Sequence, residues 1–163
     1  MKKIMIVLCL IILIICGIII FVLGKRFMSN DIKIFRNIEI DTLTCEIEKK
    51  EDSHGGFLGD GEYFAKIKCS KIGKLSNNWK KLPLSEQLRE IMEMKRCDGR
   101  GCMNIYEKYS IPNIKGYYLF LDRHSEAKDK YDDTNINKRS SYNLTLVLLD
   151  IETNIMYYYV LDT

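Results

Sequence analysis

An unbroken apolar run near the start of the chain limits what this chain can fold into more than any other feature. From Ile4 to Gly24 every residue is apolar or glycine. A helix of that length, at about 1.5 Å per residue, measures roughly 31 Å and matches a hydrocarbon core of about 30 Å. Because a helix satisfies its backbone groups internally, the run can cross a bilayer. We therefore expect residues 1–26 to form a single-pass transmembrane helix with charged flanks.

Two other N-terminal signals compete with this interpretation. A cleavable signal peptide has an apolar region of about 7–15 residues that ends at small residues, and this run is longer and lacks such a site. A lipid-attached cysteine needs a small residue before it, whereas bulky Ile15 precedes Cys16. Basic residues flank the run on both sides, so the positive-inside rule does not decide its orientation. A very short N-terminal tail usually stays in the cytoplasm, which predicts an extracytoplasmic C-terminal domain at the cell membrane.

The net charge of +3 belongs to the predicted anchor rather than to the domain behind it. The whole chain holds 25 basic and 22 acidic side chains, and residues 1–26 hold four of the basic ones and no acidic one. The rest of the chain therefore carries 21 basic and 22 acidic side chains, for a net charge of −1. This balance gives no reason to expect a nucleic-acid partner. The membrane, contacted through residues 4–24, is the partner that the sequence predicts, and no cofactor signature is present.

Residues 27–41 are expected to form a juxtamembrane segment, and the alternation that follows it predicts a hairpin. Apolar and polar residues alternate along 42–50 and again along 62–70, on either side of a glycine-rich connection. Such patterns predict two antiparallel strands. A symmetric loop would place Ile47 opposite Ile67 and Cys45 opposite Cys69.

The remaining pattern places one main helix and three more strands in a single domain at 42–163. Ser85 is a favourable N-cap, and an apolar stripe follows it at Leu88, Ile91 and Met92. The helix is expected to end at Asp98–Gly101, and a short helical turn is expected within 103–109. The three strands are expected at 116–122, 141–149 and 155–161. The order β-β-α-β-β-β predicts an α+β domain, with an antiparallel sheet and the main helix packed on a face.

Four of the six cysteines lie outside the predicted anchor. A glycine-rich loop between Cys97 and Cys102 is able to bring those two together, and the predicted register brings Cys45 to Cys69. Two disulfides in these positions are one of three connectivities that four cysteines allow. Four reduced cysteines that pack as small apolar residues are an alternative, and so is a zinc site with a loose ligand spacing.

Two segments stand out as candidate ligand-binding loops. The first, HGGFLGDG at 54–61, holds four glycines that permit close approach of a ligand to the backbone, although it also suits a shaped hairpin connection. The second, Asp122-Arg123-His124, ends a predicted strand and opens a long polar loop. The candidate binding residues are His54, Gly55, Gly56, Gly59, Asp60, Asp122, Arg123 and His124. If the two loops met at one end of the sheet, His54, Asp60, Asp122 and His124 would suit a metal or an acid–base pair.

Several strings of the domain resemble a group of small, uncharacterised membrane-anchored proteins of low-GC Gram-positive bacteria. The resemblance rests on HGGFLGDGEYFAKI at 54–67, on Trp79 with KLPLS at 81–85, on GYYLFLDRHSEAKDKYDD at 116–133 and on the C-terminal NLTLVLLDIETNIMYYYVLDT. It implies a bacterial source, a signal or membrane segment and a compact domain, and it carries over no catalytic residue.

No nucleophile–histidine pair of a known hydrolase and no nucleotide-binding motif occurs in the sequence. We therefore expect a non-enzymatic binding or interaction module at the cell surface. One alternative is a metal-assisted hydrolase that uses His54, Asp60, Asp122 and His124. Another is a cytoplasm-facing regulatory or immunity-type partner of a membrane protein.

Overall fold

A computed structural model gives the fold of the chain. It divides the chain into two compact units, Met1–Glu39 and Ile40–Thr163. The predicted anchor at 4–24 lies outside the described residues, and in the residues that are described no helix is long and apolar enough to cross a membrane. The residues that the structure describes are 34, 37–41, 43–55, 59–99 and 101–163.

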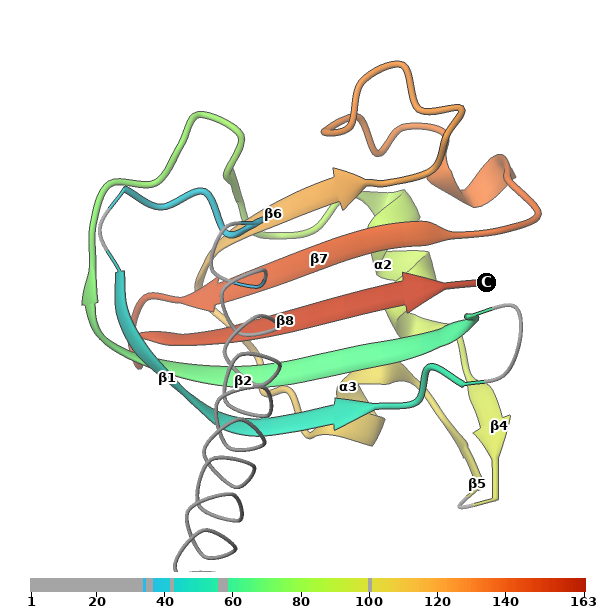
Figure 1. The fold of residues 1–163 in the computed structure, drawn as a ribbon, viewed down its shortest axis with the longest axis horizontal. Helices are drawn as coiled ribbons and strands as arrows, with labels where there is room; N and C mark the ends of the chain where they lie inside the picture. Colours follow the sequence, from blue (N-terminus) through green and yellow to red (C-terminus); the bar gives the residue numbers. More distant parts are fainter. Residues whose placement is uncertain (1–33, 35–36, 42, 56–58, 100) are drawn as a thin grey trace, which may run out of the picture. The chain divides into compact units, whose positions relative to one another are not determined.

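Among these residues, the second unit is built on a six-stranded sheet in the order β1-β2-β8-β7-β6-β3 (Figure 1). All its neighbouring strands are antiparallel, so the α+β class and the antiparallel sheet predicted from the sequence are confirmed. Its strands are β1 (Leu43–Asp52), β2 (Gly61–Ile72), β3 (Lys80–Lys81), β6 (Gly116–Asp122), β7 (Asn143–Asp150) and β8 (Ile155–Asp162). Two short helices, α2 (Glu86–Glu93) and α3 (Ile105–Tyr109), lie behind the sheet in the view of Figure 1. A 3-10 turn, η1 (Ile136–Lys138), lies within the long loop before β7.

Side-chain caps fix where the two helices begin. The Ser85 hydroxyl accepts a hydrogen bond from the Leu88 backbone N–H at 3.3 Å, which confirms the predicted N-cap of α2. Asn104 and Glu107 form a reciprocal capping box at the start of α3. With their ends satisfied in this way, both helices turn apolar faces toward the sheet. The resulting core includes Leu88, Ile91 and Met92 of α2, Ile105 and Tyr109 of α3, and Phe64, Phe120, Leu146 and Tyr159 of the sheet.

The predicted register of the β1–β2 hairpin is confirmed at its centre. Cys45 lies opposite Cys69, and Ile47 lies opposite Ile67. Irregularities between Thr44 and Cys45 and between Ile47 and Lys49 shift the register by one residue on each side. These shifts are typical of β-bulges, which bend a strand and increase its twist. A symmetric loop alone does not predict them.

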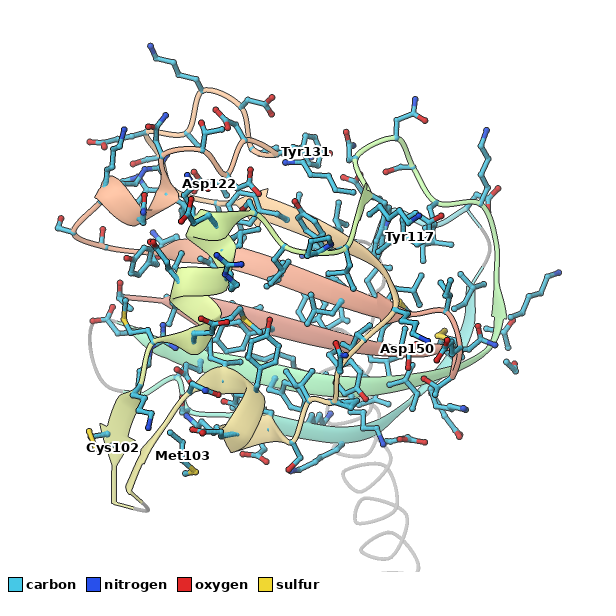
Figure 2. All side chains as sticks on the ribbon, turned by 180° about the vertical axis from the view of Figure 1, so that it is seen from behind. Cys102, Met103, Tyr117, Asp122, Tyr131 and Asp150 are labelled. Atoms are coloured by element: carbon cyan, nitrogen blue, oxygen red, sulfur yellow. A yellow bond between two sulfur atoms is a disulfide. The ribbon has the colours of Figure 1, made fainter. Side chains whose placement is uncertain are left out.

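The predicted end of the main helix is wrong. Helix α2 stops at Glu93, and the segment expected to carry its last turns forms a hairpin of β4 (Arg96–Asp98) and β5 (Gly101–Met103). In Figure 2 this hairpin, with Cys102 and Met103 labelled, projects past the end of the sheet at the lower left. The physical reason is that the apolar stripe of α2 ends at Met92, so further helical turns would have had no buried face to stabilise them.

Both cysteine pairs are joined by disulfides. Cys45 and Cys69 connect β1 to β2, and Cys97 and Cys102 connect β4 to β5. Of the alternatives that the sequence left open, the structure therefore contains the two-bridge pattern. These four sulfur atoms are bonded in pairs and are not available as free thiols or zinc ligands.

Candidate functional site

The two candidate loops leave the same end of the sheet. Strand β2 begins at Gly61 and strand β7 begins at Asn143, and both residues lie opposite Asp162 at the end of β8. Strand β6 ends at Asp122, opposite Leu144 of β7. The connection after β1 and the loop after β6 therefore start close to the C-terminus, which Figure 1 marks at the end of β8.

His54 is held by carboxylates on both sides of its ring. Its Nδ1 lies 2.7 Å from Oδ1 of Asp52, and its Nε2 lies 3.2 Å from Oδ2 of Asp162. The backbone N–H of His54 donates to the same Asp52 oxygen at 3.0 Å. With both ring nitrogens engaged, the imidazole has no nitrogen free to bind a metal ion. The contact with Asp162 instead fastens the loop to the last strand.

Arg123 reaches the same carboxylate from the opposite loop. Its Nη2 donates to Oδ1 of Asp162 at 2.6 Å and to the carbonyl of Leu144 at 3.2 Å, and its Nε donates to Oγ1 of Thr145 at 3.1 Å. Asp162 thus joins two predicted site residues through charge-assisted hydrogen bonds. We call this group of three residues the His54–Asp162–Arg123 network.

Asp122 and His124 form a separate, local arrangement. The Asp122 side chain is 1% exposed, and its Oδ2 accepts from Nη1 of Arg139 at 2.5 Å. Its Oδ1 accepts from the backbone N–H of His124 at 3.0 Å, in the manner of an Asx turn. The His124 ring accepts the backbone N–H of Glu126 at 3.3 Å and lies 3.4 Å from the Ser141 hydroxyl. Through Arg139 and Ser141, these contacts join the start of the loop after β6 to its end.

The remaining predicted residues of the glycine-rich loop are exposed. Gly55, Gly59 and Asp60 lie at the surface, and Gly59 has a positive φ of 73° that favours glycine. Gly56 lies outside the described residues. In the described part of the chain, the Asp60 side chain makes no ion pair with the His54–Asp162–Arg123 network.

The four residues considered for a metal-assisted hydrolase do not form a metal centre. Across the residues that the structure describes, no three His, Cys, Asp or Glu side chains are placed to share a metal ion. His54 is bonded to Asp52 and Asp162, whereas Asp122 is bonded to Arg139. The two loops leave the same end of the sheet, but the four side chains do not meet at one point: His54 pairs with Asp162 and Asp122 pairs with Arg139.

No protein-family model, curated protein or solved structure matches this chain. The resemblance to small Gram-positive membrane proteins therefore stays a prediction.

A buried carboxylate that the sequence did not single out lies one residue beyond the glycine-rich loop. Glu62 accepts hydrogen bonds from Nζ of Lys108 at 2.5 Å and from the Tyr109 hydroxyl at 3.0 Å, and Nη1 of Arg96 lies 3.6 Å away. Burial raises the pKa of the Glu62 carboxyl, but the hydrogen bonds and positive charges of these neighbours together lower it below its usual value of 4.5. The ionised carboxylate therefore ties β2 to helix α3 and to the β4–β5 hairpin.

The helix-covered side of the domain also holds a pocket of about 360 Å³. Residues of α2, of α3, of the segment 111–114 and of β7 line it. Its floor includes the buried side chains of Leu84, Ile111 and Leu148. None of the residues predicted from the sequence as ligand-binding lines this pocket. The residues that do line it come from elements far apart in the sequence and share no motif, so no local pattern marks them.

Replacing Gly61 with alanine tests how the first loop is held. A Cβ at this position would lie 2.6 Å from the Cα and 2.7 Å from the N of His54, both backbone atoms that cannot swing aside. We expect Gly61→Ala to displace His54 from Asp162 and to lower the free energy of unfolding by about 2 kcal/mol. Chemical denaturation measures this loss, and the NMR shifts of the His54 ring report the displacement.

Gly55→Ala is the matched control in the same loop. A Cβ there would meet only the Ser53 carbonyl oxygen, at an ordinary 3.9 Å. We expect a change within about 0.5 kcal/mol. Equal losses in the two variants would contradict the close approach of Gly61 to His54.

Proposed function

We propose that the chain is a single-pass membrane-anchored protein that displays a disulfide-stabilised α+β binding module at the outer face of the cell membrane. The observation that carries this proposal is the pair of disulfides in the domain. Disulfides form and persist in oxidising compartments and are rare in the cytosol. They favour an external domain over a cytoplasm-facing regulatory partner, and the apolar run at 4–24 supplies the anchor.

A binding role fits the chemistry of the domain better than catalysis does. His54 and Asp122 of the predicted loops are engaged with Asp162 and Arg139, so these two lack the open position that a reacting group needs. The pocket between α2 and α3, in contrast, combines an apolar floor with polar groups at its rim. That combination is typical of small-ligand sites.

Thiol labelling of intact cells tests the location of the domain. We expect a membrane-impermeant maleimide to leave the chain unlabelled until an impermeant reductant is added, and then to modify the four domain cysteines. A chain in which Cys45, Cys69, Cys97 and Cys102 are serine is the control, since its two other cysteines lie within the apolar run. Labelling that appears only after the cells are lysed would contradict an external domain.

A further inference from the structure

Two unpaired charges of opposite sign flank the pocket between α2 and α3. Arg89 and Glu93 both line it, and they lie one turn apart on α2, which places them on the same helix face. Both side chains are exposed. Within the described part of the chain, neither side chain has a hydrogen-bond or ion-pair partner, including the other one.

The Tyr106 side chain of α3 lies near both charges and is half-buried in the pocket lining. Burial raises the pKa of its hydroxyl, the Glu93 charge raises it further, and the Arg89 charge lowers it. Both charges are thus within electrostatic reach of the same hydroxyl. The rim therefore offers a cation, an anion and a phenol above an apolar floor.

These groups restrict the ligand that the pocket can hold. A purely anionic ligand, such as a phosphate, would face Glu93, and a purely cationic ligand would face Arg89, each at a cost in free energy. A dipolar group can satisfy both charges at once. The floor of Leu84, Ile111 and Leu148 then favours an apolar body attached to that group.

We propose that this pocket binds a free α-amino acid with a bulky apolar side chain. The carboxylate of the ligand pairs with Arg89, its ammonium group pairs with Glu93, and its side chain covers the apolar floor. The volume of about 360 Å³ is at the small end of the range of roughly 300–1,000 Å³ for small-molecule sites, which suits such a ligand. This inference deepens the proposed function, because it names the ligand class of the displayed module.

Calorimetric titration of the full chain in detergent micelles tests the proposal. L-phenylalanine and L-leucine are expected to bind saturably, whereas L-serine is not, because it leaves the apolar floor uncovered. Blocking either end of the ligand, in N-acetyl-phenylalanine or phenylalaninamide, is expected to weaken binding about tenfold or more, since each removes one charge-assisted contact. Arg89→Gln and Glu93→Gln are expected to weaken phenylalanine binding to a similar extent.

Glu86→Gln and Lys95→Gln are the matched controls, because each removes an exposed charge near or on α2 that does not line the pocket. They are expected to change affinity by less than about twofold. Equal thermal midpoints for all four variants would show that the fold is kept. The proposal is overturned if neither phenylalanine nor leucine binds at millimolar concentration, or if the blocked ligands or the Arg89 and Glu93 variants bind as tightly as the originals. Neither failure would alter the labelling result in intact cells, so the location of the domain is judged separately.

Discussion

Glu62→Gln is expected to lower the free energy of unfolding by about 3 kcal/mol at pH 7. The Glu62 side chain is 9% exposed, and the Lys108 side chain paired with it is 16% exposed. Removing the negative charge leaves the Lys108 ammonium and the Arg96 guanidinium without their buried partner. Breaking such a pair from one side costs more than the intact pair contributes, because the remaining charge is poorly solvated. Urea denaturation of the full chain in detergent measures the loss.

Glu48→Gln is the matched control on the neighbouring strand. Glu48 lies 2.8 Å from Lys66, but both side chains are more than one third exposed. A solvent-exposed ion pair of this kind contributes about 0–1 kcal/mol. If the Glu48 variant lost as much stability as the Glu62 variant, burial of the Glu62 carboxylate would not be the reason for the larger loss expected there.

The effect of Glu62→Gln is also expected to depend on pH. Because the native pKa of Glu62 is lower than its usual value of 4.5, the unfolded chain binds more protons than the folded chain between those two values. The stability that the carboxylate contributes is thus fully present above about pH 4.5 and is lost as the pH falls through the native pKa. The difference between wild type and Glu62→Gln should therefore shrink in acid. A constant difference between pH 7 and pH 3 would argue against an ionised Glu62 as its source.

Features of the domain that depend on neighbouring residues were predictable from the sequence. Alternating apolar residues identified β1 and β2, and Ser85 marked the start of α2, because these signals act over a few positions along the chain, whereas the short strands β3, β4 and β5 were not predicted. The central register of the β1–β2 hairpin followed from a short connection between two alternating segments. The predicted membrane helix stays a prediction, since its residues lie outside those that the structure describes.

Features that depend on distant pairings were not predictable. His54 meets Asp162 across 108 positions, and Asp162 carries no motif that would mark it as a partner. Tyr109 meets Glu62 across 47 positions, and an isolated glutamate in a strand usually indicates a solvent-facing side chain. The pocket likewise gathers Arg89, Tyr106 and Leu148 from three elements. Such sites arise only after the sheet and helices have assembled, so local patterns cannot reveal them.

Removing the Cys45–Cys69 disulfide by a double alanine substitution is expected to lower the free energy of unfolding by about 3.5 kcal/mol. The bridge joins residues 24 positions apart, and closing a loop of that length removes much conformational freedom from the unfolded chain. The Cys97–Cys102 bridge spans only 5 positions, so the matching double substitution should cost only about 2 kcal/mol. Denaturant unfolding under non-reducing conditions compares the two variants, and a larger loss for the shorter loop would contradict the chain-entropy account.

Full reduction of the wild-type chain should combine both losses, at about 5.5 kcal/mol, because the two bridges lie in different parts of the domain. That loss is comparable to the whole free energy of unfolding of a marginally stable protein, since about 5–15 kcal/mol is usual. A reduced domain would therefore be close to unfolding, and the fold itself would depend on an oxidising compartment. If the reduced chain instead unfolds at the same denaturant concentration as the oxidised chain, the fold does not depend on the bridges, and this account of their contribution is wrong.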